Sequence, residues 1–504
     1  MTETVLAASA AAADPASGLA LDDALAAVRR ALGDDPERIV RAPEPGGNVS
    51  DFAGRLLPAM IRPAHAGQVP DVVRAFARPD APPLHAVSTG RNWGLGSREA
   101  AHDGAVRLEL DGLDRIRELD VEAGHAVVEP GVTQLRLTSE LTGGPRMLNV
   151  TASSGHSSVL GNALDRGVGL RRQRTDDLVG LEVVLPDGEV IRVGWWPGAR
   201  SAGLPTAGLA PNPYGLGPSL LHLFTQSPFG IVTAGVVRLL PRPEAQRVLR
   251  LAFDRDRLAA AVDELRHWHV QGLVHGVLKI YDTTSATTYG TAGGPGGYLT
   301  HIALGGTAAV ADAMTGEVRR RADASGLFTS FARSDQEPPA ADDVVARVVE
   351  HGYAGSVAHH EEMLRSAVGR DAELVDGEGG GWIFFLPLVP FTGRDVTAAL
   401  RLLDQVHEET GIRPGATVNA LDADVIDLVV SLRFPREGTG PRQAHAALDR
   451  LYELFGAAGY LPYRLDVDHG DWAGRLTDPG ALALTRRLRD AVDPHRVIAP
   501  GRYV

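Results

Sequence analysis

The stretch AVSTGRNWGLGSREA, residues 86–100, combines many small side chains with hydroxyls and one arginine. The residues of interest in it are Ser88, Thr89, Gly90, Arg91, Asn92, Trp93, Gly94, Gly96 and Ser97. Glycine lets the backbone adopt positive φ angles and approach a ligand closely. Successive inward-pointing N–H groups form an anion-binding concavity, to which hydroxyls add donors. We therefore expect this loop to bind a diphosphate, with a glycine-rich surface turn as the alternative for the loop taken alone.

The loop differs from the two commonest phosphate-binding motifs. It is not a Walker loop, because no Gly-Lys-Ser/Thr follows it. It is not the Gly-x-Gly-x-x-Gly motif that opens a helix either, because SREAAHDGAVRLEL continues toward a strand.

The composition indicates a globular protein and excludes several classes of function. The chain has 504 residues, 44% of them hydrophobic, which suffices for two or three domains. No apolar run approaches the roughly 18 to 20 residues of a membrane span, and the N-terminal stretch reads as a disordered tail rather than a secretory signal. A net charge of −13 without a basic stripe argues against nucleic acid as a partner. The absence of cysteine excludes disulfides and thiolate metal sites and favours a cytoplasmic location.

The pattern along the chain predicts an α+β protein with at least two domains. Residues 21–33 and 71–78 have helical spacing, and Gly33 supplies a stop for the first helix. Residues 178–194 predict a hairpin around an Asp-Gly turn. A strand at 230–244 ends in prolines that suggest a domain boundary, after which helices and strands alternate.

Later segments share the small, hydroxyl-rich character of the first loop. They are VEPGVT (128–133), TASSGHSSVLGNALDRGVG (151–169), LFTQSPFGIVTAGVVRLLPRPE (223–244) and AVDPHRVIAPGRY (491–503). In order and spacing, these segments resemble the FAD-binding domain shared by vanillyl-alcohol oxidase and p-cresol methylhydroxylase (PCMH). The resemblance covers residues 50–504 and is weakest across residues 245–375.

The resemblance implies a two-domain FAD-binding PCMH-type fold of the α+β class, with an antiparallel-sheet cap over the substrate. A tail and helix would occupy residues 1–45, the FAD-binding domain 46–244 and the cap 245–455, while 456–504 would return to the FAD domain. Residues 88–97 would wrap the FAD pyrophosphate. Further cofactor contacts implied are Pro130, Ser153, Ser157, Gly161, Asn162, Gly230, Ile231, Val232 and Arg502.

The resemblance also implies an active site that departs from the family in places. Phenol oxidases of this family hold a phenolate with two tyrosines and an arginine, and Tyr463 and Arg464 match one tyrosine and the arginine. Leu95 stands at the other tyrosine position and would face the substrate. Packing at the cap interface is the alternative role for Tyr463 and Arg464.

Two further departures concern the flavin. Trp382 stands at a tethering histidine position and Asn92 at another, so we expect FAD to be held non-covalently, with Trp382 facing the substrate. Ser153 replaces an aspartate near the flavin and cannot act as a carboxylate base. His156 is the candidate base. A covalent link from His156 to the flavin is a minor alternative, and a purely structural hydrogen bond from His156 to the backbone is another.

Other polar stretches are weaker candidates. Arg171, Arg172 and Arg174 would favour an acidic substrate or, alternatively, form surface ion pairs with the aspartates at 176–177. Tyr353 would line the cap pocket. The adjacent histidines at 359–360 lack the spacing of a zinc helix and predict the start of a surface helix, so no metal is expected.

The leading hypothesis is an FAD-dependent oxidoreductase, either an oxidase or a dehydrogenase. It would remove a hydride from a hydroxyl- or amine-bearing carbon of a small aromatic or cyclic metabolite, with oxygen or another electron acceptor closing the cycle. Tyr463 and Arg464 would orient the substrate oxygen. A non-redox step such as cyclisation, and a binding protein with a decayed site, are the alternatives. The resemblance implies a homodimer.

Overall fold

The computed structural model describes residues 15–33, 35–44, 46–91, 93–96, 98–198, 210–282, 296–501 and 503. Residues 1–14 of the predicted tail, and the predicted sites Asn92, Ser97 and Arg502, lie outside the described residues, while residues 15–18, also predicted as tail, begin a helix.

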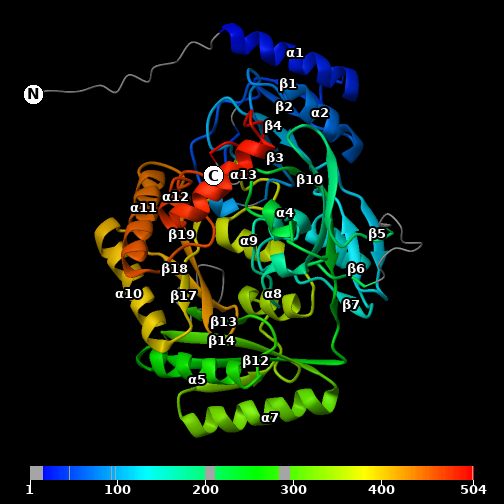
Figure 1. Cartoon of the computed structure of the whole chain (residues 1–504). Helices are drawn as coiled ribbons and strands as arrows, with labels where there is room; N and C mark the ends of the chain where they lie inside the picture. The colour runs from blue at the N-terminus through cyan, green and yellow to red at the C-terminus, as the bar shows by residue number, and fades with distance from the viewer. Residues whose placement is uncertain are drawn as a thin grey trace, which may run out of the picture.

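A small sheet near the N-terminus carries the glycine loop (Figure 1). Its strands are β1 (Ile39–Arg41), β2 (Ala59–Ile61), β4 (Val106–Glu109) and β3 (Leu84–Val87), in that spatial order. β2 and β3 each run parallel to β4. The helices α1 (Pro15–Leu32) and α2 (Val69–Phe76) bury apolar side chains against this sheet. The predicted stop is confirmed, since α1 ends before Gly33, whose φ is +85°.

A five-stranded antiparallel sheet completes the N-terminal half. Its order is β5 (Ile116–Asp120), β6 (His125–Val128), β10 (Ile231–Arg238), β8 (Leu178–Val184) and β9 (Val190–Gly194). The predicted hairpin is confirmed, because β8 pairs with β9 in register from Gly180 opposite Gly194 to Val184 opposite Val190. The short helices α3 (Gln134–Glu140) and α4 (Val159–Leu164) precede β8, and β7 (Arg146–Met147) pairs with β11 (Leu240–Pro241).

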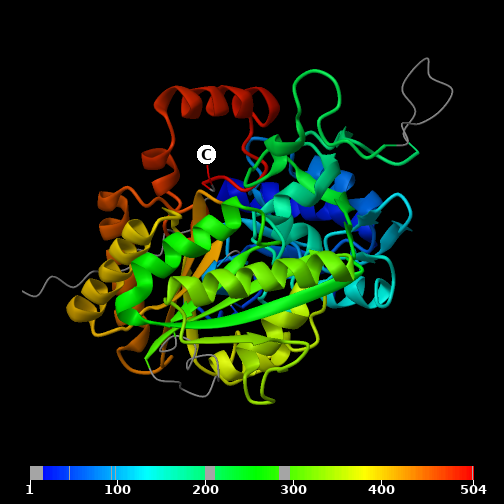
Figure 2. The same cartoon turned by 90° about the horizontal axis from the view of Figure 1, so that it is seen from below.

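An eight-stranded antiparallel sheet forms the cap (Figures 1 and 2). Its order is β15 (Ser330–Arg333), β12 (Ala245–Asp254), β14 (Gly297–Gly306), β13 (Leu278–Asp282), β18 (Gly415–Ala420), β19 (Val425–Phe434) and β16 (Gly381–Phe385), with β17 (Leu388–Pro390) also on β19. One face packs against α5 (Leu258–Val270), α7 (Ala308–Ser325), α10 (Gly393–Thr410) and α11 (Gly440–Ala458) in the largest core. The opposite face turns toward the N-terminal half, with α8 (Val344–Tyr353) and α9 (His360–Val368) beside it.

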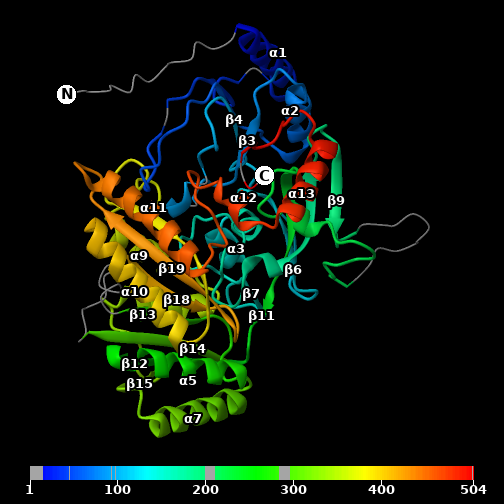
Figure 3. The same cartoon turned by 60° about the vertical axis from the view of Figure 1, so that its left-hand side comes forward.

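The chain returns to the N-terminal sheet after the cap. Beyond α12 (Trp472–Leu476) and α13 (Pro479–Val492), Ile498 pairs with Leu84 of β3, and the Ala499 N–H donates to the Leu84 carbonyl. Figure 3 shows the C-terminal end close to β3. Among the described helices, none has the length and apolar character needed to cross a membrane.

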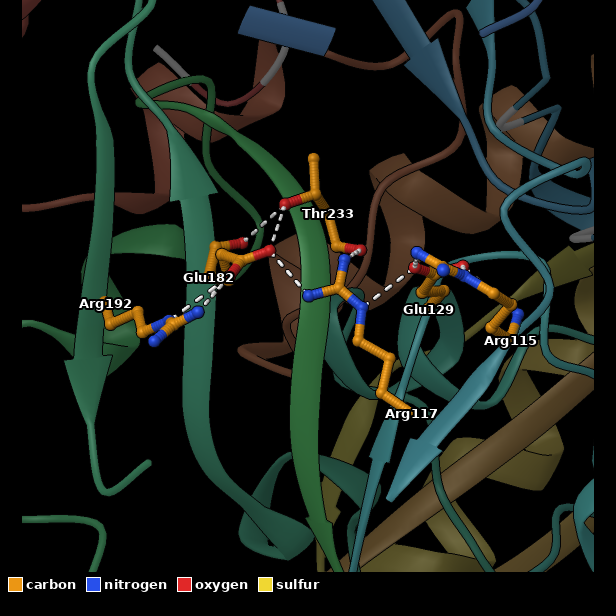
Figure 4. Close-up of polar contacts among 6 residues, drawn as sticks. All are labelled: Arg115, Arg117, Glu129, Glu182, Arg192 and Thr233. Atoms are coloured by element: carbon orange, nitrogen blue, oxygen red, sulfur yellow. Dashed lines mark hydrogen bonds and ion pairs between the residues drawn. The ribbon is translucent and has the colours of Figure 1, made fainter. Parts of the chain in front are cut away.

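Two buried glutamates tie the strands of the five-stranded sheet together (Figure 4). Glu129 accepts from Arg115 at 2.9 Å and Arg117 at 2.8 Å. Arg117 also donates to Glu182 at 2.8 Å, and Glu182 in turn accepts from Arg192 and Thr233. Glu129 precedes Pro130, so this network fixes the start of a loop that reaches the cavity described below.

We expect Glu129→Gln to lower the free energy of unfolding by about 2 to 3 kcal/mol, because it removes charge-assisted hydrogen bonds from a buried carboxylate. Burial alone would raise the pKa of Glu129. The hydrogen bonds from Arg115 and Arg117 lower it by more than burial raises it, so the pKa of Glu129 in the folded protein lies below its usual value. The stabilisation is therefore complete above the unfolded pKa and is lost as the pH falls through the depressed folded value. Urea denaturation at pH 7 and pH 4 measures both effects.

Glu317→Gln is the matched control. Glu317 also accepts from two arginines, Arg320 and Arg321, but on the exposed surface of α7. Water and salt screen such pairs, so this variant should unfold close to the wild-type midpoint. Equal losses in the two variants would contradict a special role for the buried network.

Candidate active site

A cavity of about 410 Å³ lies between the glycine loop and the inward face of the cap sheet. Most of the predicted site residues line it. They are Ser88, Thr89, Gly90, Arg91, Trp93, Leu95, Pro130, Ser153, Ser157, Gly161, Asn162, Gly230, Ile231, Val232, Trp382, Tyr463 and Arg464. Segments from His85 to Tyr503 thus converge on one space.

The glycine loop uses positive φ angles and tight packing. Gly90 has φ +67° and Gly96 has φ +63°. Gly94 and Gly96 do not line the cavity but allow close packing beneath it. A Cβ on Gly94 would come 1.9 Å from the Phe384 ring, and one on Gly96 would come 2.7 Å from Val467. These two glycines let the cap strand β16 and the C-terminal segment press against the loop.

The second predicted segment approaches the loop equally closely. A Cβ on Gly161 would lie 2.4 Å from the Ser88 hydroxyl. Ser158 caps α4: its hydroxyl accepts from the Gly161 N–H at 2.9 Å and donates to the Pro130 carbonyl at 2.6 Å. The Ser158 N–H donates to the Thr89 hydroxyl at 3.1 Å. Three segments far apart in sequence are therefore locked together on one side of the cavity.

Tyr463, which is half-buried, and Arg464, which is buried, lie at the other side of the cavity as part of a polar cluster. The Tyr463 hydroxyl donates to Asp427 Oδ2 at 3.4 Å, and the Arg464 guanidinium pairs with Asp165. Burial lowers the pKa of Arg464, but the Asp165 carboxylate outweighs it and the pKa is raised, so Arg464 is a permanent cation. Burial and Asp427 raise the pKa of Tyr463 well above its usual value, so its hydroxyl keeps its proton.

The cap sheet contributes polar side chains to the cavity that were not predicted from the sequence. Lys279 and Tyr281 of β13, Thr417 and Asn419 of β18, and Asp427 of β19 all line the cavity. Burial raises the pKa of Asp427 to about 6 and lowers that of Lys279 to about 8. A signal for them was available, since each charged residue interrupts an otherwise apolar strand, VLKIYD or VIDLVVSL.

Besides Gly94 and Gly96, two predicted residues lie outside the cavity lining, His156 and Tyr353. His156 is directed at Glu361 of α9, with Nε2 3.6 Å from the Glu361 carboxylate, so the structure gives no support for it as the base. Tyr353 is fully buried in the core, and its hydroxyl donates to the backbone carbonyl of Val277. His156 lies in a hydroxyl-rich loop and Tyr353 at the end of α8, and both side chains are directed away from the site.

The arginines at 171, 172 and 174 are structural. Arg174 is completely buried and donates to Gln134 and to the Val159 carbonyl, both at 3.1 Å. Arg172 pairs with Asp177 at 2.6 Å, and Arg171 donates to the Tyr353 carbonyl. None of the three lines the cavity. The predicted ion pair between an arginine and Asp177 is present, but the prediction that it lies on the surface was wrong, because Asp177 is buried.

The expected surface helix start near residue 359 is also corrected. His360, the first residue of α9, is completely buried and its Nε2 lies 2.6 Å from the Thr151 carbonyl. Burial lowers the pKa of His360 to about 4, so it stays neutral and serves to hold α9 against the loop at residue 151.

Comparison with known proteins agrees with this geometry. The FAD binding domain family matches residues 57–194. A 1'-carboxy-chondrochloren decarboxylase of Chondromyces crocatus is 31% identical over 96% of this chain and 97% of its own length. The flavoprotein subunit of 4-cresol dehydrogenase [hydroxylating] from Pseudomonas putida is 26% identical over 83% of this chain and 82% of its own. The structure of p-cresol methylhydroxylase with substrate bound superposes with a TM-score of 0.82, 23% identity and 96% coverage of both chains.

The fold and the cavity define a flavoprotein that binds FAD. The chain belongs to the PCMH-type family of FAD-linked oxidoreductases. Its two-domain fold with an antiparallel cap is the predicted one.

The cavity wall fits FAD chemically. The glycine loop and α4 approach each other at Gly161, where any side chain would intrude. Asn162 Oδ1 is buried in the wall and has no hydrogen-bond partner among the described residues. A buried amide oxygen without a donor indicates a ligand that supplies one. The residues around it, from Ser88 to Arg91 and from Ser157 to Asn162, would hold the cofactor.

Proposed function

We propose that this protein oxidises a small aromatic or cyclic metabolite by removing a hydride from a carbon that a hydroxyl or amine activates. The observation that carries the proposal is that Tyr463 and Arg464 line the same cavity as the glycine loop. FAD, when bound there, supplies the hydride acceptor. Oxygen or another electron acceptor would complete the cycle.

The two residues would act on the substrate oxygen. Loss of a hydride leaves an electron-poor carbon. A deprotonated hydroxyl that is conjugated to this carbon donates electron density to it and so stabilises it. Arg464 supplies fixed positive charge for that oxygen anion, and Tyr463 supplies a hydroxyl donor. Asp427 has a pKa raised to about 6, so it is ionised at neutral pH, and it accepts a hydrogen bond from Tyr463. It would hold the proton that the substrate hydroxyl releases.

Leu95 lines the cavity at the position of the second tyrosine. An apolar side chain there removes one donor to the oxygen anion. A simple para-alkylphenol, held by its hydroxyl alone, should therefore bind weakly and react slowly but still lose a hydride, whereas the preferred substrate would be bound by additional contacts elsewhere in the cavity.

We expect 4-ethylphenol to bleach the flavin absorbance of the purified holoprotein in the absence of oxygen, and air to restore it. Acid precipitation of the same sample should leave the yellow colour in the supernatant. Trp382 and Asn92, which stand at the two tethering positions of the family, offer no nucleophile to the flavin, and His156 does not line the cavity. Colour in the pellet would contradict non-covalent FAD. Product formation without bleaching would contradict hydride removal and favour a non-redox step.

A second candidate is hydride removal coupled to loss of carbon dioxide. It is favoured by the buried cation Lys279 in the cavity wall and by the similarity to a protein named as a decarboxylase. In 3-(4-hydroxyphenyl)propionate, hydride loss from the carbon next to the ring would give a quinone methide. Breaking the bond to the carboxylate then releases CO₂, and its electron pair forms the new double bond and restores the phenolate. One CO₂ and one 4-vinylphenol per reduced flavin would identify this reaction.

A further inference from the structure

Lys279 is the only lysine in the sequence, while the other 49 of its 50 basic residues are arginine. The one lysine is buried, at 6% exposure, in the middle of β13 and lines the cavity. Arginine stays charged and is bulky, whereas lysine carries a compact charge and can lose its proton when buried. A chain that uses arginine everywhere else therefore has a specific requirement for lysine at this position.

Among the described residues, the Lys279 ammonium has one side-chain hydrogen-bond partner, Asn419, to whose amide oxygen it donates. No described carboxylate lies within 4.0 Å of it, the distance of an ion pair. Asp427 attracts the ammonium only from beyond that distance. A buried cation without a paired anion is costly, so its retention points to an anion that arrives with a ligand.

The register of the cap sheet shows what surrounds this ammonium. Lys279 lies opposite His301 of β14 on one side and Asn419 of β18 on the other. Asn419 lies opposite Asp427 of β19 and donates to its Oδ2 at 3.5 Å. Asp427 Oδ1 is buried without a hydrogen-bond partner among the described residues. His301, Lys279, Asn419 and Asp427 thus form a polar row across the sheet. In this row, the Lys279 ammonium without an ion pair and the Asp427 Oδ1 without a hydrogen bond belong to residues that line the same cavity.

We propose that Lys279 binds a carboxylate of the substrate, so that the preferred substrates are hydroxylated aromatic compounds with a short acidic side chain. Asn419, Asp427 and Tyr463 form a continuous set of contacts between Lys279 and Arg464. A small substrate can therefore place its hydroxyl at Tyr463 and its carboxylate at Lys279. The identity of the hydroxyl site rests on the proposed function; the carboxylate site rests on Lys279 alone.

The charged groups facing Lys279 define its pH dependence. His301 is buried, and its pKa is lowered to about 3, so it stays neutral. Asp427 is the nearest anionic group, and Arg464 and Arg250 are permanent cations farther along the row. Tyr281, on the same strand, offers only its ring face at 5.8 Å. With a pKa lowered to about 8, Lys279 carries its charge below pH 8 and loses it above.

The test compares two ligands that differ only in the carboxylate. We expect wild-type protein whose bound FAD has been reduced with dithionite, so that neither ligand is turned over, to bind 3-(4-hydroxyphenyl)propionate about 10- to 100-fold more tightly than 4-ethylphenol at pH 7, by anaerobic calorimetry. Lys279→Met should abolish this preference while changing the affinity for 4-ethylphenol less than about 3-fold. Retention of the preference in Lys279→Met would overturn the proposal, as would a wild-type protein that binds both ligands equally.

Two measurements do not depend on that variant. Above pH 8 the ratio of the wild-type affinity for the acid to that for 4-ethylphenol should fall about 10-fold per pH unit, until the two affinities are equal. In Lys279→Arg, any ratio that remains should not change with pH up to pH 10. Because there is one lysine, protein made with ¹³Cε-lysine gives one side-chain signal. The carboxylate ligand should raise the pKa read from that signal by about one unit or more, and 4-ethylphenol should not. A signal that titrates identically with both ligands would overturn the proposal.

These outcomes are separate from those of the proposed function. Flavin bleaching by 4-ethylphenol tests hydride removal without involving a carboxylate. If bleaching fails and the preference for the acid persists, the carboxylate site stands and the reaction is a different one. If bleaching occurs and the preference is absent, the oxidoreductase proposal stands and Lys279 has another role.

Discussion

Arg464→Met should lower the rate of flavin reduction by a phenolic substrate about 100- to 1,000-fold. Arg464 is buried at 7% exposure, lines the cavity and is paired with Asp165. Its charge lies beside Tyr463 at this end of the cavity. Methionine fills a similar volume without charge, so the substrate oxygen would have to ionise near Asp165 and Asp427 without the Arg464 cation.

The measurement is anaerobic stopped-flow reduction with saturating 4-ethylphenol, which isolates the hydride step from reoxidation. Tyr463→Phe removes only the hydroxyl donor and should have a smaller effect in the same direction. Arg242→Met is the matched control, because Arg242 is a partly buried arginine that donates to the carbonyls of Gly144 and Ala354 away from the cavity. Arg242→Met should reduce flavin at the wild-type rate in the folded protein, even if its melting temperature falls. A wild-type rate in Arg464→Met would refute the assigned role.

Gly161→Ala should weaken FAD binding about 10- to 100-fold. The new Cβ would lie 2.4 Å from the Ser88 hydroxyl and 3.2 Å from that of Ser158, so the glycine loop must move away from α4. Both segments line the cavity, and their separation sets the width of the space for the cofactor. The readout is the dissociation constant of FAD from the reconstituted apoprotein, followed by recovery of flavin fluorescence.

Gly316→Ala provides the matched control. Gly316 lies within α7, and a Cβ there meets no atom within 4 Å. Alanine is the better helix former by about 1 kcal/mol, so this variant should be at least as stable as the wild type and bind FAD unchanged. If both variants bind FAD equally, the close approach at Gly161 does not shape the cofactor site.

The residues missed by sequence analysis share one property. Lys279, Asn419 and Asp427 come from three strands that are separated by up to about 150 residues, and each looks like an isolated polar interruption of an apolar run. Only the antiparallel register of β13, β18 and β19 places them side by side on one face. The count of one lysine against 49 arginines was a usable signal for Lys279, but not for its neighbours.

The opposite error occurred with His156 and Tyr353. Both lie in segments that do reach the cavity, and position in sequence suggested that their side chains would face it. In a loop or at a helix end, neighbouring side chains point in different directions, so a correct segment does not imply a correct side chain. His156 turns toward Glu361 and Tyr353 into the core.

By itself, the sequence determined what depends on local backbone chemistry and on segment order. Glycines and hydroxyls predicted a diphosphate-binding loop at residues 86–100, and a Gly or an Asp-Gly turn fixed the end of α1 and the β8–β9 hairpin. The resemblance to the family assigned that loop to FAD and singled out the adjacent residues Tyr463 and Arg464. The tertiary structure alone decided which charges are desolvated and which share a wall. Burial and a shared cavity wall arise from packing between strands that are distant in sequence. This packing removes Lys279 and Asp427, residue types that are usually exposed, from water and places both in the cavity lining.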